Sequence, residues 1–221
     1  MSLLTQALVG LLLAVSAVVA EPQNLTIVVS PAGTESSPAV EAMRRETARL
    51  VSPADYAVAW VSKGQAALGD SFEQLVVVRF RGVCQSQAEQ DQPLADSSSL
   101  ATTAVSNGQV LPFVDVDCDR TRRLIAPALT ALPSAARETL FGRALGRVLA
   151  HELYHVLAQT KDHKDHGVSK PCFRVADLVS TRFRFDAVSL AQMRPAPQLA
   201  RQAQPPAPVD LDAAADDAAG R

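Results

Sequence analysis

The four histidines of this chain all lie between positions 151 and 166, and two of them belong to a motif that can do metal chemistry. His151, Glu152 and His155 form the pattern HExxH, in the stretch His-Glu-Leu-Tyr-His. Two histidines four residues apart project from the same face of a helix, so both imidazoles can reach one metal ion. Glu152 lies about 100° around the helix from His151. The motif therefore predicts a zinc site at which the carboxylate of Glu152 takes a proton from an attacking water.

A third ligand must come from outside the motif, because a catalytic zinc ion usually takes three protein ligands and leaves one position open. His163 and His166 follow His155 by eight and eleven residues, so either imidazole could return to the metal after a turn. Asp177 is an acidic alternative, although its place near the start of the last predicted helix favours a capping role. The residues alone leave this choice open.

A long helix is predicted to carry the motif, from about residue 135 to residue 159, with Ser134 as its cap. Gly142 and Gly146 would allow close packing against a sheet, and Tyr154 is interpreted as a packing residue. The apolar residues fall on more than one side, which is typical of a buried helix: Leu140, Phe141, Leu145, Val148, Leu149, Leu153 and Leu157. The polar His and Glu side chains of a buried helix need hydrogen-bond partners or a metal ion.

The segments around this helix predict an α+β domain. Short β-branched or apolar runs predict strands, and the Asn107-Gly108 step between two of them predicts a hairpin with an edge strand. Helical spacing of apolar residues predicts two further helices. The predicted strands are residues 25–30, 56–61, 75–80, 100–105 and 109–116, and the predicted helices are residues 38–51 and 175–193. The most apolar run, residues 75–80, is expected at the centre of the sheet.

The two ends of the chain differ from its middle. Residues 1–20 carry no charged side chain and end in small residues, which predicts a secretory signal peptide cleaved after Ala20; the alternative is a retained membrane anchor. Residues 195–221 are rich in Pro, Ala, Gln and Asp, which predicts a disordered tail. The folded domain is therefore expected to span residues 21–194.

Charge and cysteine content exclude some classes of protein. Lys plus Arg is 21 and Asp plus Glu is 23, so the net charge is −2 and nucleic-acid binding has little support. Three cysteines are too few for a fold built on disulfides. In an exported protein they can still pair. The positions of Cys84 and Cys118 after predicted strands favour a disulfide between them, with Cys172 free.

The stretch HELYHVLAQTKDH resembles the zincin metalloproteases, and most closely their metzincin branch, in which a third histidine follows the HExxH helix after a turn. The metzincin position, six residues past the second histidine, holds Lys161 here. The stretch is also similar to uncharacterised secreted bacterial zincin-like proteins with a longer spacing and a glycine four residues after the third histidine, where this chain has Gly167. The resemblance implies His163 as the third ligand. It leaves His166 as an alternative ligand or a contact to the transition-state oxyanion.

The zincin resemblance also implies a fold and a reaction. The implied fold is α+β, with a twisted mixed sheet and an antiparallel edge strand packed on the buried helix, followed by a C-terminal helix. We expect an exported zinc-dependent metalloendopeptidase, secreted or periplasmic, with one Zn²⁺ per chain and Glu152 as general base. A peptide or protein substrate would bind along the edge strand. The chain is expected to be a monomer without stable membrane contact after signal cleavage.

Two other functions fit the same residues. One is a non-enzymatic exported zincin-like module with a structural or inactive metal site. A closed site that uses both His163 and His166 would favour it, because no position would remain for a water. The other is a histidine-rich metal carrier, which binding of several metal equivalents would favour.

Overall fold

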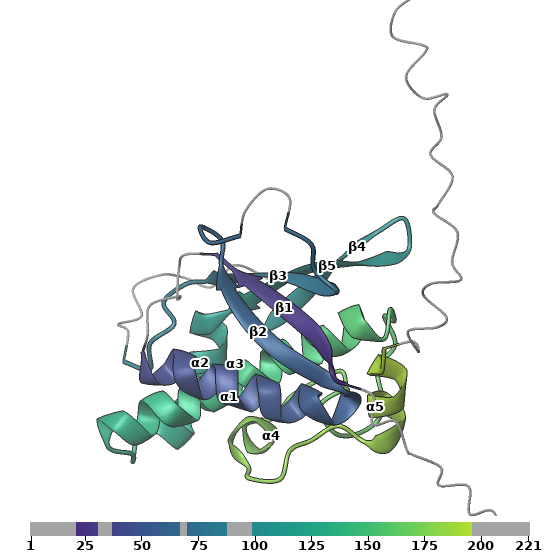
Figure 1. Ribbon diagram of the computed structural model, residues 1–221. Coiled ribbons are helices and arrows are strands. Elements are labelled where there is room, and N and C mark those ends of the chain that lie inside the picture. The colour runs from purple at the N-terminus through teal and green to yellow at the C-terminus, as the bar shows by residue number, and fades with distance from the viewer. Residues whose placement is uncertain (1–20, 31–36, 67–69, 88–98, 196–221) are drawn as a thin grey trace, which may run out of the picture.

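A five-stranded mixed sheet forms one layer of the protein, and helices cover one of its faces (Figure 1). The computed structural model describes residues 21–30, 37–66, 70–87 and 99–195. The strand order is β2-β1-β3-β5-β4. The strands are β1 (Gln23–Val29), β2 (Tyr56–Ser62), β3 (Gln74–Arg81), β4 (Ala101–Ser106) and β5 (Gln109–Asp117). The predicted combination of helices with a mixed sheet is confirmed, and β3 lies at the centre as expected.

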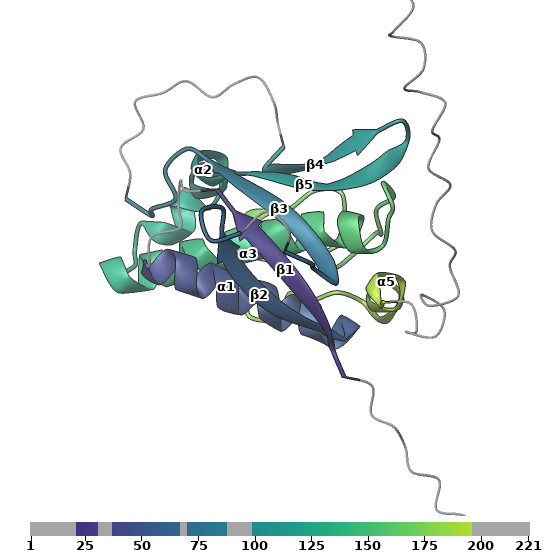
Figure 2. The ribbon, with the colours of Figure 1, turned by 45° about the horizontal axis from the view of Figure 1, so that its top comes forward.

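Strand β4 is the antiparallel edge that the sequence predicts. Strands β1, β2, β3 and β5 pair in parallel, and β4 runs antiparallel along β5. Between these two strands Asn107 and Gly108 have φ of 48° and 81°, the left-handed conformations that a two-residue hairpin turn requires. Figure 2 shows the hairpin extending above the C-terminal half of helix α3 (Ser134–Leu157).

One hydrophobic core fills the space between the sheet and the helices. Leu25, Val76 and Val78 point inward from β1 and β3, and each is wholly buried. They meet Leu145 and Leu149 of α3, which are also buried. Helix α3 is therefore the buried helix predicted from its apolar residues on several sides.

Helix α1 (Pro38–Val51) packs beside α3 at very close range (Figure 1). A Cβ added at Gly142 would lie 2.0 Å from the carbonyl oxygen of Ala39, and one added at Gly146 would lie 2.7 Å from that of Met43. The prediction that these glycines face the sheet is wrong, because they face α1. The two helix backbones approach so closely that no side chain fits between them. A short 3-10 helix, η1 (Ser52–Ala54), follows α1.

The start of α3 also differs from the prediction. Ser134 does not cap the helix, because it is already the first helical residue and Pro133 occupies the capping position. The Ser134 hydroxyl instead accepts a hydrogen bond from Nε2 of Gln87 at 2.7 Å. The helix ends at Leu157, close to the predicted end.

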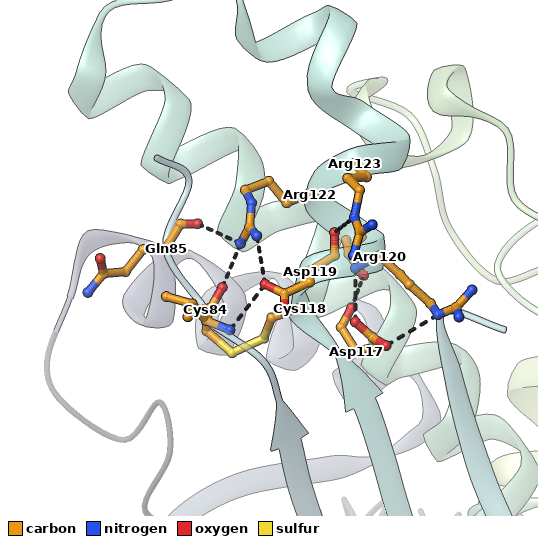
Figure 3. A network of polar contacts seen from close by, with 10 residues as sticks. Cys84, Gln85, Asp117, Cys118, Asp119, Arg120, Arg122 and Arg123 are labelled. Atoms are coloured by element: carbon orange, nitrogen blue, oxygen red, sulfur yellow. Dashed lines mark hydrogen bonds and ion pairs between the residues drawn. A yellow bond between two sulfur atoms is a disulfide. The ribbon is translucent and has the colours of Figure 1, made fainter. Parts of the chain in front are cut away.

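Helix α2 (Cys118–Leu129) was not predicted. Its signal is Asp117, whose side chain caps the helix by accepting from the Arg120 backbone N–H at 2.9 Å. Cys118 forms the predicted disulfide with Cys84, and their Cα atoms are 5.0 Å apart. Arg122 donates to the backbone oxygens of Val83 and Gln85 and to Asp119, so the same network ties α2 to the end of β3 (Figure 3). Cys172 is free and exposed, as expected.

The C-terminal helix predicted over residues 175–193 is wrong. The structure has two short helices there, α4 (Val175–Val179) and α5 (Ala187–Met193). Ser180 is extended, with φ −60° and ψ 162°, and ends α4. Phe183 and Phe185 are both buried, and Arg182 and Arg184 beside them are exposed, which is the two-residue period of an extended segment.

The predicted signal peptide, residues 1–20, and residues 196–221 of the predicted tail lie outside the described residues. Most of the polar segment between β3 and β4, residues 88–98, lies outside them as well. Within the described part of the chain, no helix has both the length and the apolar character needed to cross a bilayer.

Candidate metal centre

Helix α3 brings the two histidines of the motif together on one buried face. The Nε2 atoms of His151 and His155 are 3.2 Å apart, and each residue is 8 % exposed. His163 joins them, so that one ligand atom from each of the three imidazoles lies within 4.8 Å of the others. The structure thus assembles a group of three histidines that could hold a metal ion.

Two backbone carbonyls orient the buried imidazoles. Nδ1 of His151 lies 2.7 Å from the Val168 oxygen, and Nδ1 of His155 lies 2.8 Å from the Thr160 oxygen. A carbonyl can only accept, so each Nδ1 is assigned the proton and each Nε2 keeps its lone pair. This is the arrangement by which proteins fix the tautomer of a metal-binding histidine.

The close approach of the two Nε2 atoms fits a bound cation. Once each Nδ1 carries the proton, the two nitrogens 3.2 Å apart are both acceptors, and no donor lies between them. Two such lone pairs repel unless a proton or a cation lies between them. A metal ion bound by both nitrogens satisfies them together.

His163 reaches the site through a sharp turn after the helix. Gln159 has φ of 48°, and the Thr160 N–H donates to the His155 oxygen at 3.1 Å, which reverses the chain. The His163 ring then stacks on His151 with centroids 5.2 Å apart and meets His155 edge-on at 4.8 Å. His163 is exposed, so the third ligand position lies at the solvent side of the group.

Burial keeps the helical imidazoles neutral. It lowers the pKa of His151 to about 4, against the opposing effect of the hydrogen bond to Val168. Burial also lowers the pKa of His155, again opposed by its hydrogen bond to a backbone oxygen. A metal ligand must be the neutral form, so at neutral pH these two histidines need to release no proton to bind an ion.

Glu152 lies beside the histidines and contacts the edge strand. Its Oε2 accepts a hydrogen bond from the Thr103 hydroxyl of β4 at 2.7 Å. Burial raises the pKa of Glu152 to about 7, while the bond from Thr103 acts in the opposite direction. A carboxyl group with a pKa near neutrality is well matched to accepting and returning protons.

These residues line a cleft of about 850 Å³. One wall is β4, the edge strand, and another is α2, so the cleft separates the hairpin from the second helix. The lining also contains apolar side chains, namely Leu100, Val110, Leu124, Val148 and Phe173. Such a cleft can admit a chain-like molecule to the three imidazoles.

The other predicted site residues lie elsewhere. His166 is exposed and lines a separate hollow with Asp165 and Arg184, outside the three-histidine group. Asp177 accepts from Nζ of Lys170 and from the Arg174 backbone N–H at the start of α4, which is the capping role expected for it.

Sequence reasoning missed the partners that orient the site. Thr103 carries no motif, and its contact with Glu152 depends on strand pairing across the hairpin. The carbonyls of Thr160 and Val168 are backbone groups, so residue identity alone does not predict their hydrogen bonds to the histidines. Tyr154 is fully buried, as expected of a packing residue, and its hydroxyl bonds to Gln192 of α5.

A comparison with models of protein families finds no match, and a search of curated proteins finds no similar sequence. The likeness to zincins therefore depends on the HExxH motif and on the position of His163 beside it. What the geometry itself supports is a three-histidine metal centre with a carboxyl group beside it, open to a cleft.

Proposed function

We propose that this protein is an exported zinc-dependent metallopeptidase. The observation that carries the proposal is the convergence of His151, His155 and His163 at the floor of a cleft, with Glu152 beside them. Three imidazoles with one open side are the ligand set of a catalytic zinc site rather than a closed structural one. When bound, zinc would polarise the scissile carbonyl and acidify the attacking water.

The residues of the chain supply the remaining steps. Glu152 is the general base: its carboxylate takes the proton of the attacking water and later returns it to the leaving amine. The Thr103 hydroxyl keeps that carboxyl group oriented through its 2.7 Å hydrogen bond. Val168 and Thr160 hold the imidazoles in place through their carbonyls, so the ligand set is formed before substrate arrives.

The edge strand is proposed to hold the substrate. Among the strands of the described residues, β4 has no neighbour on its outer side, and Ala101, Thr102 and Thr103 line the cleft. An extended peptide can add to such an edge by main-chain hydrogen bonds. This mode of binding would carry the peptide past the three histidines.

Export is supported by the disulfide between Cys84 and Cys118, because disulfides persist mainly in oxidising compartments. A secreted or periplasmic location remains a prediction from residues 1–20. N-terminal sequencing of the exported protein tests it, with Glu21 as the expected first residue.

The first prediction concerns Glu152. Glu152→Gln should retain one zinc per chain and reduce hydrolysis of denatured casein about a hundredfold or more, since the amide cannot accept the proton. Metal content is measured by mass spectrometry of the purified protein, and hydrolysis by the appearance of new peptide termini. Glu41→Gln, at a half-exposed position on α1, is the matched control and should cleave normally.

Two results would contradict the proposal. Cleavage by Glu152→Gln at the wild-type rate would exclude the proposed role of the carboxylate. One zinc per chain in a wild-type protein that cleaves no peptide would instead identify a non-enzymatic metal-binding module.

A further inference from the structure

The lining of the cleft has an excess of positive side chains, whereas the chain as a whole has a small net negative charge. The lining includes four cationic side chains: Arg120, Arg123, Lys161 and Lys170. Glu152 is the one carboxylate among the described residues that line it. The whole chain has a net charge of −2, so this concentration of positive charge is local.

Two of the four cations already have carboxylate partners. Nε of Arg120 lies 3.3 Å from Asp117, as Figure 3 shows, and Nζ of Lys170 bonds to Asp177. Arg123 differs, because its Nε makes a long 3.5 Å contact with the Asp119 backbone oxygen, which carries no charge. Within the described ranges of the chain, neither Arg123 nor Lys161 forms an ion pair.

Both cations line the cleft that contains the three histidines. Val148 precedes His151 by three residues, so it lines the cleft within one helical turn of that ligand. Leu124 and Arg123 of α2 line the same cleft, and α2 packs against α3. Lys161 also lines the cleft and directly follows Thr160, whose carbonyl accepts a hydrogen bond from His155.

Arg123 can meet a bound substrate because it lines the cleft together with the apolar Leu124 and Val148. A substrate side chain at this part of the lining would contact both apolar surface and a guanidinium. A carboxylate on a short aliphatic stem complements such a pocket.

We propose that the cleft selects peptides with an acidic side chain, Asp or Glu, close to the scissile bond, and that Arg123 is the residue that determines this specificity. Lys161 adds a second cation to the lining of the cleft. This inference rests on the proposed peptidase function and names its class of substrate. A preference that depends on these cations is electrostatic, so a high salt concentration should weaken that preference.

The test begins with cleavage of denatured casein by the zinc-loaded full chain, with the cut sites read by mass spectrometry. One cleaved peptide is then made in two versions, with Glu or with Gln at the acidic position nearest the cut. The wild type should cleave the Glu version about tenfold faster in kcat/KM. Arg123→Gln should cleave both equally, and Arg123→Glu should prefer the Gln version.

Arg45→Glu is the matched control. Arg45 is an exposed arginine on α1, outside the cleft, so its reversal changes the net charge equally. It should leave the preference for Glu unchanged. Thermal unfolding midpoints of all variants, compared with the wild type, check that Arg123 substitutions leave the fold intact.

A binding measurement separates this inference from the peptidase proposal. Zinc-loaded Glu152→Gln is titrated with two fluorescein-labelled decapeptides of Ala and Leu that carry either Glu or Gln at four positions. We expect the Glu peptide to bind about tenfold more tightly, and the advantage to disappear when Arg123→Gln is added.

The cleavage and binding results together distinguish a failure of the acidic preference from a failure of the peptidase function. Equal cleavage of the Glu and Gln substrates overturns the acidic preference and leaves the peptidase function standing. Binding that depends on Arg123, in a chain that cleaves nothing, supports an acid-selective cleft and overturns the peptidase function. No cleavage and equal binding overturn both.

Discussion

In each buried histidine of the motif, one ring nitrogen hydrogen-bonds to the backbone, and the other is left to bind a ligand in the cleft. Nδ1 of His151 and Nδ1 of His155 bond to carbonyls of the segment that follows α3. The Nε2 atoms face one another without a donor between them. Backbone groups from beyond the helix thus fix both rings in the orientation that a metal site would need.

The third ligand can be tested at the same scale. His163→Ala should lose most of the bound zinc, because His163 belongs to the group of three imidazoles, whereas His166→Ala should retain one equivalent, because His166 lines a separate hollow. Metal content is measured by mass spectrometry after dialysis against a weak chelator. Equal loss in the two variants would contradict the three-histidine site and favour a closed site that uses both residues.

At the scale of elements, the pairing of α1 with α3 positions the helix that carries His151 and His155. Their contact surface depends on Gly142 and Gly146, where added Cβ atoms would lie 2.0 Å and 2.7 Å from carbonyl oxygens of α1. Helix α3 therefore packs against α1 as well as against the sheet. Its C-terminal half then lies under the β4–β5 hairpin, which supplies Thr103 to Glu152.

The close contact of α1 with α3 leaves no room for a side chain at Gly142. In an exposed helix Gly→Ala is stabilising by about 1 kcal/mol, but here the methyl group would collide with backbone. Gly142→Ala should therefore lower the free energy of unfolding by about 1–3 kcal/mol, as overpacking does. Urea unfolding measures this. Gly64→Ala is the control, since a Cβ there meets nothing within 4 Å, and an equal loss in both variants would contradict the close packing.

Elements with a strong local signal could be predicted from the sequence, and those that depend on distant partners could not. The Asn107-Gly108 turn and the apolar run of β3 are local, and both are where the sequence indicates. The break between α4 and α5 is not local, because the Ser180 carbonyl accepts from the buried Arg147 of α3. The contact of Thr103 with Glu152 likewise needs the hairpin and α3 to meet first.

At the scale of the whole molecule, one buried ion pair joins three separate parts of the fold. Arg147 is 1 % exposed, and its Nε donates to Glu46 of α1 at 2.7 Å. Its other nitrogens donate to the backbone oxygens of Asp177 and Ser180, at 2.6 Å and 2.5 Å. The pair therefore holds α1, α3 and the α4 segment together, one turn of helix before His151.

This pair predicts how the stability of the protein depends on pH. Burial tends to raise the pKa of Glu46, but the hydrogen bonds from Arg49 and Arg147 outweigh it, so the pKa lies below its ordinary value of 4.5. A carboxylate with a lowered pKa stabilises the fold above that ordinary value, and the stabilisation is lost as the pH falls through the lowered pKa. Glu46→Gln should cost about 3 kcal/mol at pH 7, because it leaves Arg147 buried without its counter-charge.

The cost of Glu46→Gln should shrink as the pH falls below 4.5, where the wild-type carboxylate also becomes protonated. Urea unfolding at pH 7 and at successively lower pH, with a chelator present throughout, measures the difference between variant and wild type without a contribution from bound metal. Glu41→Gln is the control, because Glu41 forms a half-exposed pair with Arg44 at 3.5 Å and should cost less than about 1 kcal/mol. A cost for Glu46→Gln that stays the same down to the acid limit would mean that packing at this position, rather than its charge, joins α1 to α3.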